Sequence, residues 1–389
     1  MSKVILSANT DWYLYNFRLS MAQAIQHEGV EVLLLSPLGQ YVSKIQNSGL
    51  RWSGLHMDQH GLNPISELAL LAEILSVYQR ERPDLVHHFT VKPILYGSLA
   101  AKLLGIPAVV NSVTGLGYVF VNPGRIARVL RPVVLLGYRY AMSGRGSHAI
   151  FQNNVHRNLF IERKIVAPEK SSVILGSGID TAHFTPKGEP PGKPLIIMPS
   201  RMLFDKGVED LVRAARLLHQ AKISATVALV GDTDIGNPAA IPAEQLHAWE
   251  TEGVIEWWGY REDMLEVLTK CHIVTLPSYG EGVPKALIEA AACGKPIVAT
   301  DVPGCREVVR HEVNGLLVPA RDPEALSNAL ARLVGDRDLR ARMGEQGRRL
   351  ALKKFSNDHV NDQTLSIYRK LLPGEWPSGP GSGRKDDLK

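Results

Sequence analysis

The sequence has little cysteine and no long apolar run. Its 389 residues include three cysteines, Cys271, Cys293 and Cys305, with no paired C-x-x-C spacing, so we expect neither a disulfide framework nor a zinc site. No stretch is apolar enough to cross a bilayer, and the start, MSKVILSANTDW, lacks the cationic and apolar parts of a signal peptide. We therefore expect a cytoplasmic protein that is neither exported nor integral to a membrane.

One long segment also lacks acidic residues. None occurs between Asp84 and Glu162, although the segment holds eight lysines and arginines. The first 187 residues carry 18 basic and 11 acidic side chains, so the net charge of the whole chain, +5, comes from its first half. A positive field of this kind predicts an anionic partner.

Short apolar runs alternate with helical segments along the chain. One series runs from KVILSA to PAVVNSV and a second from PLIIMPS to GLLVPA, which predicts parallel sheets covered by helices. The stretch KGEPPGKP, residues 187–194, lies between the series and is typical of a linker. We expect two doubly wound α/β domains, residues 1–188 and 189–355. A helix over 356–372 would pack back on the first domain, and a Pro/Gly/Ser-rich tail over 373–389 would be disordered.

Two glutamates stand out in SYGEGVPKALIEAAACGKPIVATDVPG, residues 278–304. The stretch follows the predicted strand HIVTLPS, so its turn would lie at the carboxyl end of a strand, where ligands bind in open parallel sheets. Gly280 and Gly282 would let the backbone approach a ligand, and the following helix N-terminus favours a diphosphate. A carboxylate can bind vicinal hydroxyls, so one of Glu281 and Glu289 would hold a hexose and the other a ribose. The alternative, more frequent for a lone glutamate, is a solvated surface residue.

Two cations occupy the equivalent position after an earlier strand. Arg201 and Lys206 lie in RMLFDKG, which follows PLIIMPS. An arginine fork and a lysine point charge near a helix N-terminus can neutralise a leaving diphosphate without a metal. Taken alone, the pair is more often ordinary surface charge.

These motifs resemble a known family in their order and spacing. The segments PSRMLFDKGVEDLV, LVGD, GYREDM, LPSYGEGVPKALIEAAACGKPIVATDVPGCREVV and NGLLVP, over about residues 195–320, are similar to the donor domain of retaining glycosyltransferase family four. The family has the GT-B fold, in which two Rossmann-like domains face each other across a central crevice.

The resemblance implies a role for each matching residue. Glu281 would contact the transferred sugar, Glu289 the ribose, and Arg201 with Lys206 the diphosphate. The remaining donor-binding positions implied are Gly280, Gly282, Val283 and Pro284 beside the donor, and Tyr260 and Arg261 beside the base. The resemblance also implies a UDP-sugar donor, retention of configuration through attack on the same face, and no metal or other cofactor.

The first domain resembles one branch of this family. YNFRLSMAQAI, HGLNPISEL, VHHFTVKPILYGSLAAKLLGIPAVVNSVTGLGY, AIFQNNVHRNLF and ILGSGIDTAHFTP are similar to bacterial enzymes that extend lipid-linked saccharides for O-antigen, capsule and protein glycans. This branch implies a hexose or N-acetylhexosamine, with N-acetylgalactosamine the best choice, and a polyprenyl-diphosphate-linked acceptor.

The sugar-side residues of the first domain are less well defined. Many family members carry a histidine where this sequence has Thr114, so we assign no catalytic histidine. His88, at a strand end, is a candidate for the sugar side, although a histidine there is more often structural. Asn9 and Thr10, after the first strand, complete the candidates for the acceptor or sugar side.

The acid-free segment includes NPGRIARVLRPVVLLGYRYAMSGRGS. It combines apolar residues with arginines, as expected of a helix in an anionic headgroup layer. The membrane-facing candidates are Arg125, Arg128, Arg131 and Arg139. The alternative is a buried helix with a solvated basic face. Membrane contact here would make the protein peripheral on the inner face of the cell membrane.

Other functions fit the sequence less well. A UDP-sugar epimerase of the same fold would need no acceptor, but the match to the Arg/Lys and double-glutamate motifs argues against it. A two-domain binding protein with a hinge would be exported, and the sequence shows no signal peptide. An NAD-dependent oxidoreductase would need a G-x-G-x-x-G turn after the first strand, where LSANTDW stands. No nucleic-acid recognition module accompanies the basic charge. We therefore expect a glycosyltransferase.

Overall fold

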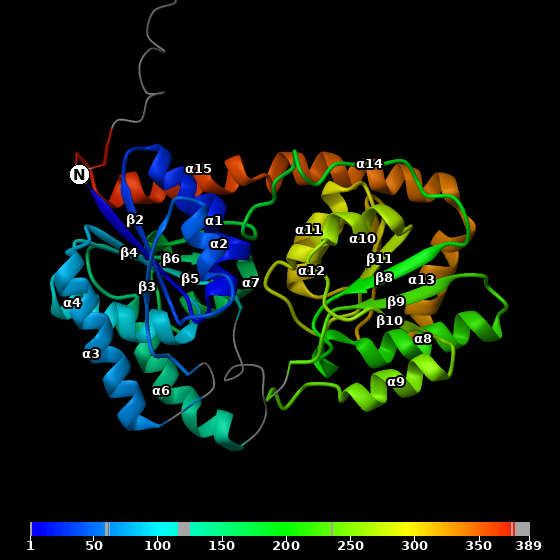
Figure 1. Ribbon diagram of the computed structural model, residues 1–389, viewed down its shortest axis with the longest axis horizontal. Coiled ribbons are helices and arrows are strands. Elements are labelled where there is room, and N and C mark those ends of the chain that lie inside the picture. Colours follow the sequence, from blue (N-terminus) through cyan, green and yellow to red (C-terminus); the bar gives the residue numbers. More distant parts are fainter. Residues whose placement is uncertain are drawn as a thin grey trace, which may run out of the picture. The chain divides into compact units, whose positions relative to one another are not determined.

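The computed structural model describes residues 2–58, 61, 63–115, 125–234, 236–374 and 376–377, without the side chains of 125–130. The chain divides into two compact units (Figure 1). The first unit joins Met1–Gly178 to Asn357–Lys389, and the second unit is Ile179–Ser356.

The first unit is a parallel sheet of seven strands in the order β3-β2-β1-β4-β5-β6-β7. The strands are β1 (Lys3–Ser7), β2 (Glu31–Ser36), β3 (Arg51–Gly54), β4 (Leu85–Phe89), β5 (Ala108–Val113), β6 (Ser147–Phe151) and β7 (Ser171–Val173). Its α-helices are α1 (Asp11–His27), α2 (Val42–Asn47), α3 (Pro64–Glu81), α4 (Ser98–Leu103), α6 (Arg125–Ala141), α7 (Asn154–Glu162) and α15 (Asn357–Leu371). The strand order reverses between β1 and β4.

Both faces of this sheet are buried, because successive side chains of a strand point to opposite faces. Val4 and Leu6 pack in one core cluster with residues of α1 and α15, whereas Ile5 packs in another with residues of α3. This explains why the strands are nearly continuous runs of Val, Ile and Leu rather than alternating patterns.

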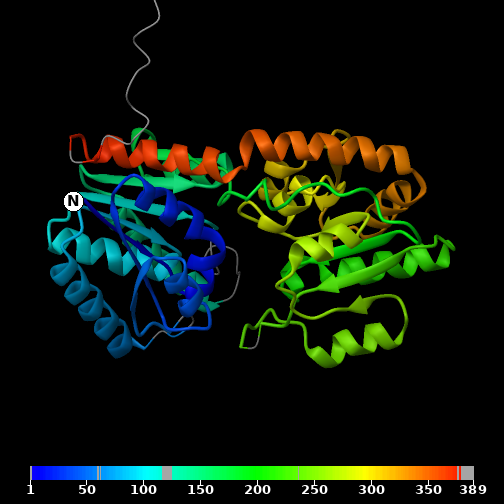
Figure 2. The same cartoon turned by 45° about the horizontal axis from the view of Figure 1, so that its top comes forward.

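The second unit is a parallel sheet of six strands in the order β10-β9-β8-β11-β12-β13. The strands are β8 (Leu195–Pro199), β9 (Thr226–Val230), β10 (Glu256–Trp257), β11 (Ile273–Leu276), β12 (Ile297–Thr300) and β13 (Gly315–Val318). Its α-helices are α8 (Val208–Gln220), α9 (Ala243–Thr251), α10 (Met264–Lys270), α11 (Lys285–Ala292), α12 (Pro303–Val308), α13 (Pro323–Gly335) and α14 (Arg337–Lys354). α14 packs along α11 (Figure 2). The strand order reverses between β8 and β11.

The predicted boundary at residue 188 lies ten residues beyond the observed one at Gly178. Ile179 already belongs to the second unit, where its amide donates to the Phe355 carbonyl at 2.8 Å. The Pro/Gly-rich stretch is also fastened there, since Glu189 forms a 2.8 Å ion pair with the buried Arg340 of α14. This stretch is therefore a loop bound to the second unit, and its composition does not mark the boundary between the two units.

The last helix, α15, packs against α1 within the first unit. Asn361 donates to the Ser20 hydroxyl at 3.0 Å, and the Tyr368 hydroxyl lies in a hydrogen bond with His87 of β4. Beyond the helix, Trp376 is buried against Tyr368, with 5.5 Å between the ring centroids. The prediction that disorder begins at residue 373 is therefore wrong for Trp376. Residues 378–389 lie outside the described part of the chain.

Within the described residues, none of the helices combines the length and the apolar character that a bilayer span requires. All three cysteines are free and buried, and burial raises the pKa of Cys271 to about 12.

Two adjacent histidines of β4 are buried in the first unit. His88 donates through Nδ1 to the Asn111 side-chain oxygen at 2.8 Å and accepts through Nε2 from the Tyr78 hydroxyl at 2.9 Å. Burial lowers the pKa of His88 to about 4. Burial lowers the pKa of His87 well below its usual value as well, and the charge of Arg18 adds to that effect. Both imidazoles are therefore neutral parts of the interior.

These histidines predict a pH-dependent stability. An unfolded histidine takes up a proton near pH 6.5, whereas folded His88 resists protonation down to about pH 4. The free energy of unfolding should therefore be nearly constant above pH 6.5 and decrease as the pH is lowered. The decrease should be about 2 kcal/mol between pH 7 and pH 5 for His88 alone. Urea denaturation at the two pH values measures this loss. His88→Gln, which does not titrate, should show a smaller loss, and an equal loss would remove His88 as the cause.

Candidate functional site

Two loops meet at the point where the strand order of the second unit reverses. The β8 loop (residues 200–207) follows β8, and the β11 loop (residues 277–284) follows β11. Ligands of open parallel sheets bind at this reversal point, outside the carboxyl ends of the strands. The two loops carry Arg201, Lys206 and Glu281.

Backbone contacts hold these loops together. The Tyr279 amide donates to the Asp205 carbonyl at 2.8 Å. Gly207 has a left-handed φ of 73°, and a Cβ there would lie 2.1 Å from the Pro277 carbonyl oxygen. Glycine is therefore required at position 207 for both its backbone conformation and the approach of the β11 loop.

This approach brings Lys206 and Glu281 into contact. The Lys206 Nζ lies 2.6 Å from the Glu281 Oε1, and the side chains are 16% and 12% exposed. Such shielding strengthens the attraction relative to a pair in water. Neither residue is thus the ordinary surface charge that each suggests alone.

Glu289 lies about one turn along α11 and is 8% exposed. Burial raises the pKa of its carboxyl group, an effect that the nearby Lys285 opposes, and Lys285 Nζ lies 3.7 Å from its Oε1. The alternative of a solvated helix residue is wrong for Glu289. The start of the helix is also well defined, because Pro284 is its N-cap residue and Val283 is buried.

Arg201 is the exposed member of the set. Its side chain is 61% exposed and donates to Asp234, which follows β9, at 2.7 Å. Arg201 and Lys206 therefore share one loop, but each is paired with a different carboxylate. The structure does not bring their charged ends together on a common partner.

Tyr260 and Arg261 follow β10 at the same edge of this sheet. The Gly259 carbonyl accepts a hydrogen bond from the Gly231 amide at 2.8 Å, which ties this turn to the end of β9. Arg261 forms two hydrogen bonds to Asp263, at 2.8 and 2.6 Å. Tyr260 is 51% exposed.

Sequence reasoning missed two residues that shape the β11 loop. A Cβ at Gly304 would lie 2.1 Å from the Gly282 carbonyl oxygen, so glycine lets α12 approach the loop. By contrast, a Cβ at Gly280 meets no atom within 4 Å, which leaves open space beside the backbone. Tyr279 fixes the loop from the other side by donating to the buried Asp210 of α8 at 2.9 Å. In the sequence, the Pro-Gly pair at 303–304 was the available signal for the role of Gly304.

The sugar-side candidates of the first unit have different environments in the structure. Thr10 is the N-cap of α1, where its hydroxyl accepts from the Tyr13 amide at 3.0 Å. His88 is fully buried with both ring nitrogens in hydrogen bonds, which supports the structural alternative and argues against a sugar contact. Asn9 and Thr114 are partly exposed and follow β1 and β5, at the carboxyl edge of the sheet.

Arg18 of α1 is a further residue that the sequence analysis missed. It is 6% exposed, its guanidinium lies 4.2 Å from the centre of the Phe89 ring, and it donates to the Tyr13 hydroxyl at 2.8 Å. Its Nε is buried without a hydrogen-bond partner, and no carboxylate within the described segments forms an ion pair with it. A buried charge without a counter-charge is costly, so an anionic ligand would stabilise it.

The predicted membrane-facing arginines differ in what the structure shows of their side chains. The side chains of Arg125 and Arg128 lie outside the described part of α6, and Arg131 is partly buried. Arg139 donates to the carbonyls of Lys164 and Arg163, at 3.1 and 3.0 Å, so its charge is engaged by the loop after α7. Arg139 is also exposed, so its membrane-facing role stays a prediction.

Apolar side chains are exposed along the described part of α6. Val133, Leu136 and Tyr140 are 68%, 66% and 46% exposed. Their spacing of three and four places them on one face of the helix. The alternative interpretation was a buried helix with a solvated basic face. The exposed face observed here is apolar, so it differs from both surfaces of that interpretation.

No group of three or more His, Cys, Asp or Glu side chains is placed to hold a metal ion in the part of the chain that the structure describes.

Two family models match the chain. "Glycosyl transferases group 1" matches residues 180–350 and includes every loop of the site in the second unit. "Glycosyl transferase 4-like" matches residues 3–154 of the first unit. The chain is a glycosyltransferase with a group 1 domain. The predicted enzyme class is therefore confirmed.

Two curated relatives of this glycosyltransferase are similar over most of its length. One is the N,N'-diacetylbacillosaminyl-diphospho-undecaprenol alpha-1,3-N-acetylgalactosaminyltransferase of Campylobacter jejuni, 28% identical over 372 residues, which cover 92% of this chain and 96% of the relative. The other is the UDP-Gal:alpha-D-GlcNAc-diphosphoundecaprenol alpha-1,3-galactosyltransferase of Escherichia coli, 25% identical over 79% of this chain and 81% of the relative.

Solved structures support the fold. Anabaena Alr3699/HepE in complex with UDP-glucose matches with a TM-score of 0.77 at 20% identity, over 96% of this chain and 100% of that one. A glycosyltransferase from Rickettsia africae matches with a TM-score of 0.75 at 20% identity, over 96% and 99% of the two chains. The predicted GT-B fold of two Rossmann-like domains is confirmed.

Proposed function

We propose that this glycosyltransferase moves a hexose or N-acetylhexosamine from a UDP-sugar to a polyprenyl-diphosphate-linked saccharide during assembly of a bacterial surface polysaccharide or glycan. The observation that carries the proposal is the shielded Lys206–Glu281 pair at the strand-order reversal of the group 1 domain. N-acetylgalactosamine is the preferred sugar, because the Campylobacter jejuni relative is named for its transfer.

The pair suits the junction between a diphosphate and a sugar. In a UDP-sugar, the anionic diphosphate is bonded directly to a ring that carries hydroxyls. Lys206 and Glu281, 2.6 Å apart, would meet these two parts, the cation on the phosphate and the carboxylate on the sugar hydroxyls. The N-terminus of α11, with open space beside Gly280, would add its dipole on the phosphate side.

The other donor contacts follow from their places at the same edge. Glu289, buried and paired with Lys285, would accept hydrogen bonds from the ribose hydroxyls. Arg201 would leave Asp234 to form a bidentate contact with the diphosphate, and Tyr260 would lie against the base. Gly282, Val283, Pro284 and Arg261 would shape the two ends of this donor site.

In the reaction, the bond between the anomeric carbon and the diphosphate oxygen breaks. Lys206, Arg201 and the amides of α11 would stabilise the negative charge that develops on the leaving group, without a metal or other cofactor. The acceptor hydroxyl would attack from the same face and lose its proton to the leaving phosphate, which retains the anomeric configuration. Glu281 would orient the ring and not form a covalent intermediate.

For the acceptor, we propose a contact through Arg18. Its guanidinium lies over Phe89, the last residue of β4, and therefore at the strand-order reversal of the first unit. The unpaired charge and the unsatisfied Nε suit the diphosphate of a polyprenyl-linked acceptor. Asn9 and Thr114 remain the candidates for contacts with the acceptor saccharide.

A lipid-linked acceptor favours action at a membrane, and α6 offers a surface for this. Val133, Leu136 and Tyr140 would enter the headgroup layer from their common face. Arg131, together with Arg125 and Arg128 earlier in the helix, would contact anionic lipids. The enzyme would thus be cytoplasmic and peripheral on the inner face of the cell membrane.

The donor site predicts that Lys206→Met and Glu281→Gln each lower the rate of transfer about 10²-fold or more, because each removes an interaction with the diphosphate or the sugar in the transition state. Transfer from UDP-N-acetylgalactosamine to an undecaprenyl-diphosphate-linked saccharide measures this, with calorimetry for UDP binding. Arg213→Gln, which removes an exposed ion pair of the same unit, should leave the rate unchanged.

Three outcomes would contradict parts of this assignment. Full activity of Lys206→Met would exclude its role. Loss of activity in a chelator would exclude a metal-free reaction. Conversion of the donor sugar without an acceptor would identify an epimerase instead.

The acceptor contact predicts an unusual pair of effects for Arg18→Met. Replacing an unpaired buried charge by an apolar side chain of similar length should leave the melting temperature unchanged or raise it. The KM for the lipid-linked acceptor should rise about tenfold or more, because one charge-assisted contact is lost, while UDP binding stays the same. A lower melting temperature with an unchanged acceptor KM would make Arg18 a purely structural residue.

The membrane surface predicts that Val133→Glu with Leu136→Glu lowers binding to vesicles that contain phosphatidylglycerol, by about tenfold or more for the loss of two buried apolar side chains. Vesicle flotation measures this. Leu38→Glu is the matched control, since Leu38 is 78% exposed in a loop of the same unit. Equal effects of the two changes would argue against α6 as the membrane surface.

A further inference from the structure

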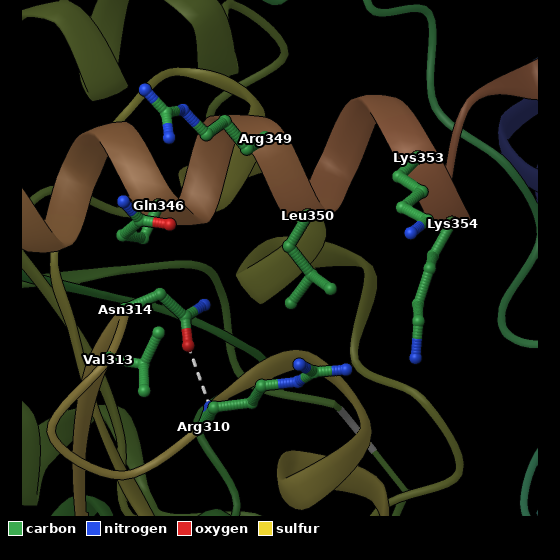
Figure 3. Close-up of a pocket in the computed structure, with 8 residues that line it drawn as sticks. All are labelled: Arg310, Val313, Asn314, Gln346, Arg349, Leu350, Lys353 and Lys354. Atoms are coloured by element: carbon green, nitrogen blue, oxygen red, sulfur yellow. Dashed lines mark hydrogen bonds between the residues drawn. The ribbon is translucent and has the colours of Figure 1, made fainter.

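A cationic pocket lies in the second unit between α14 and the turn that precedes β13 (Figure 3). Its volume is about 180 Å³. The lining residues are Arg310, Val313, Asn314, Gln346, Arg349, Leu350, Lys353 and Lys354. Four of these eight are cations and none is acidic, so the pocket is a region of positive potential.

Most of this charge has no counter-charge. Among the described residues, no carboxylate forms an ion pair with Arg310, Lys353 or Lys354. In Figure 3, the side chain of Arg310 runs beneath Leu350 toward Lys354. Two acidic residues lie nearby. Glu345 pairs with Arg349 at 2.6 Å. Burial raises the pKa of the half-buried Glu307, an effect that the charge of Lys354 opposes.

The walls of the pocket are held in place by the fold. Asn314 is 1% exposed, accepts from the Arg310 amide at 2.7 Å and donates to the Val308 carbonyl at 2.9 Å. On α14, Arg348 donates to the Phe184 carbonyl at 2.7 Å and to the Ala292 carbonyl at 2.9 Å. The cations therefore project from two fixed elements, which reduces the entropy lost when a ligand binds.

The pocket is separate from the donor site. The turn 310–314 leads into β13 and so lies at the amino edge of the parallel sheet. The β8 and β11 loops follow their strands and lie at the carboxyl edge. A ligand in this pocket would not contact Lys206 or Glu281.

We propose that this pocket binds a small phosphorylated group, a monophosphate or diphosphate, at a site distinct from the donor site. Arginine and lysine together are the side chains that recognise phosphate oxygens. The volume is below the roughly 300–1,000 Å³ typical of pockets for drug-sized ligands, so a phosphate head fits better than a whole nucleotide sugar. Val313 and Leu350 give the pocket an apolar side for the carbon atoms next to that head.

The phosphorylated group can belong to a free molecule or to a phospholipid headgroup, and the test separates these sources. The probes are inorganic pyrophosphate, phosphatidylcholine vesicles, and vesicles that also contain phosphatidylglycerol. Hydrogen exchange locates the binding, because amides in residues 308–316 and 346–354 should be protected. Calorimetry and flotation give the affinities.

The decisive comparison is between Arg310→Gln with Lys354→Gln and the single control Arg342→Gln, an exposed cation of α14 outside the pocket. The double variant should lose at least about tenfold in affinity with an unchanged melting temperature, and the control should bind normally. Protection by pyrophosphate supports a free ligand. Protection only by vesicles with phosphatidylglycerol supports a headgroup. No protection by any probe, or an equal loss in the control, would overturn the proposal.

Discussion

The proposed donor site depends on the close approach of two loops that are about 75 residues apart in sequence, as Lys206 and Glu281 show. Glycine at 304 lets α12 approach Gly282 of the β11 loop, and the approach of the two loops requires a glycine at 207 against Pro277. It is held by the Tyr279 amide on one side and the Tyr279 hydroxyl on the other. The polar chemistry of the site thus rests on backbone packing that leaves no space for a methyl group.

The proposed donor site also has an internal balance of charge. Lys206 and Arg201 are each paired with a carboxylate, Glu281 and Asp234 respectively. The two pairs act differently, because Glu281 holds Lys206 where a diphosphate would bind, which lowers the ordering that binding must supply, whereas Arg201 would have to leave Asp234. They differ in shielding, since the Lys206 pair is largely buried whereas Arg201 is mostly exposed. Salt should therefore weaken the Arg201 pair more than the Lys206 pair.

Much of the fold could be predicted because it follows from local patterns. Strands buried on both faces give unbroken Val/Ile/Leu runs, and KVILSA and PLIIMPS show them. The positions of Arg201, Lys206 and Glu281 after strands then follow from the rule for parallel sheets. The boundary at Gly178 could not be read in the same way, because the contact between Ile179 and Phe355 joins residues far apart in sequence.

The misses at the sites have a similar cause. The burial of Glu289 depends on what packs over α11. Arg18 forms no ion pair with the described residues, and this depends on where the carboxylates lie in three dimensions. A sequence shows which charges exist but not which of them remain without a partner. His88 and Arg139 illustrate the reverse case, since both have chemistry that suits a site and both are used by the fold.

The first unit is built from two separate segments of the chain, and this has a consequence for its folding during synthesis on the ribosome. Domains usually fold in the order in which they leave the ribosome. Here the first unit needs α15, because Tyr368 and Trp376 complete the core around α1 and form hydrogen bonds with His87 and Glu28. The second unit, which ends at Ser356, is fully translated before that helix exists. The second-made half of this enzyme can therefore reach its native state first, while the nascent first half awaits its final segment with an apolar surface uncovered.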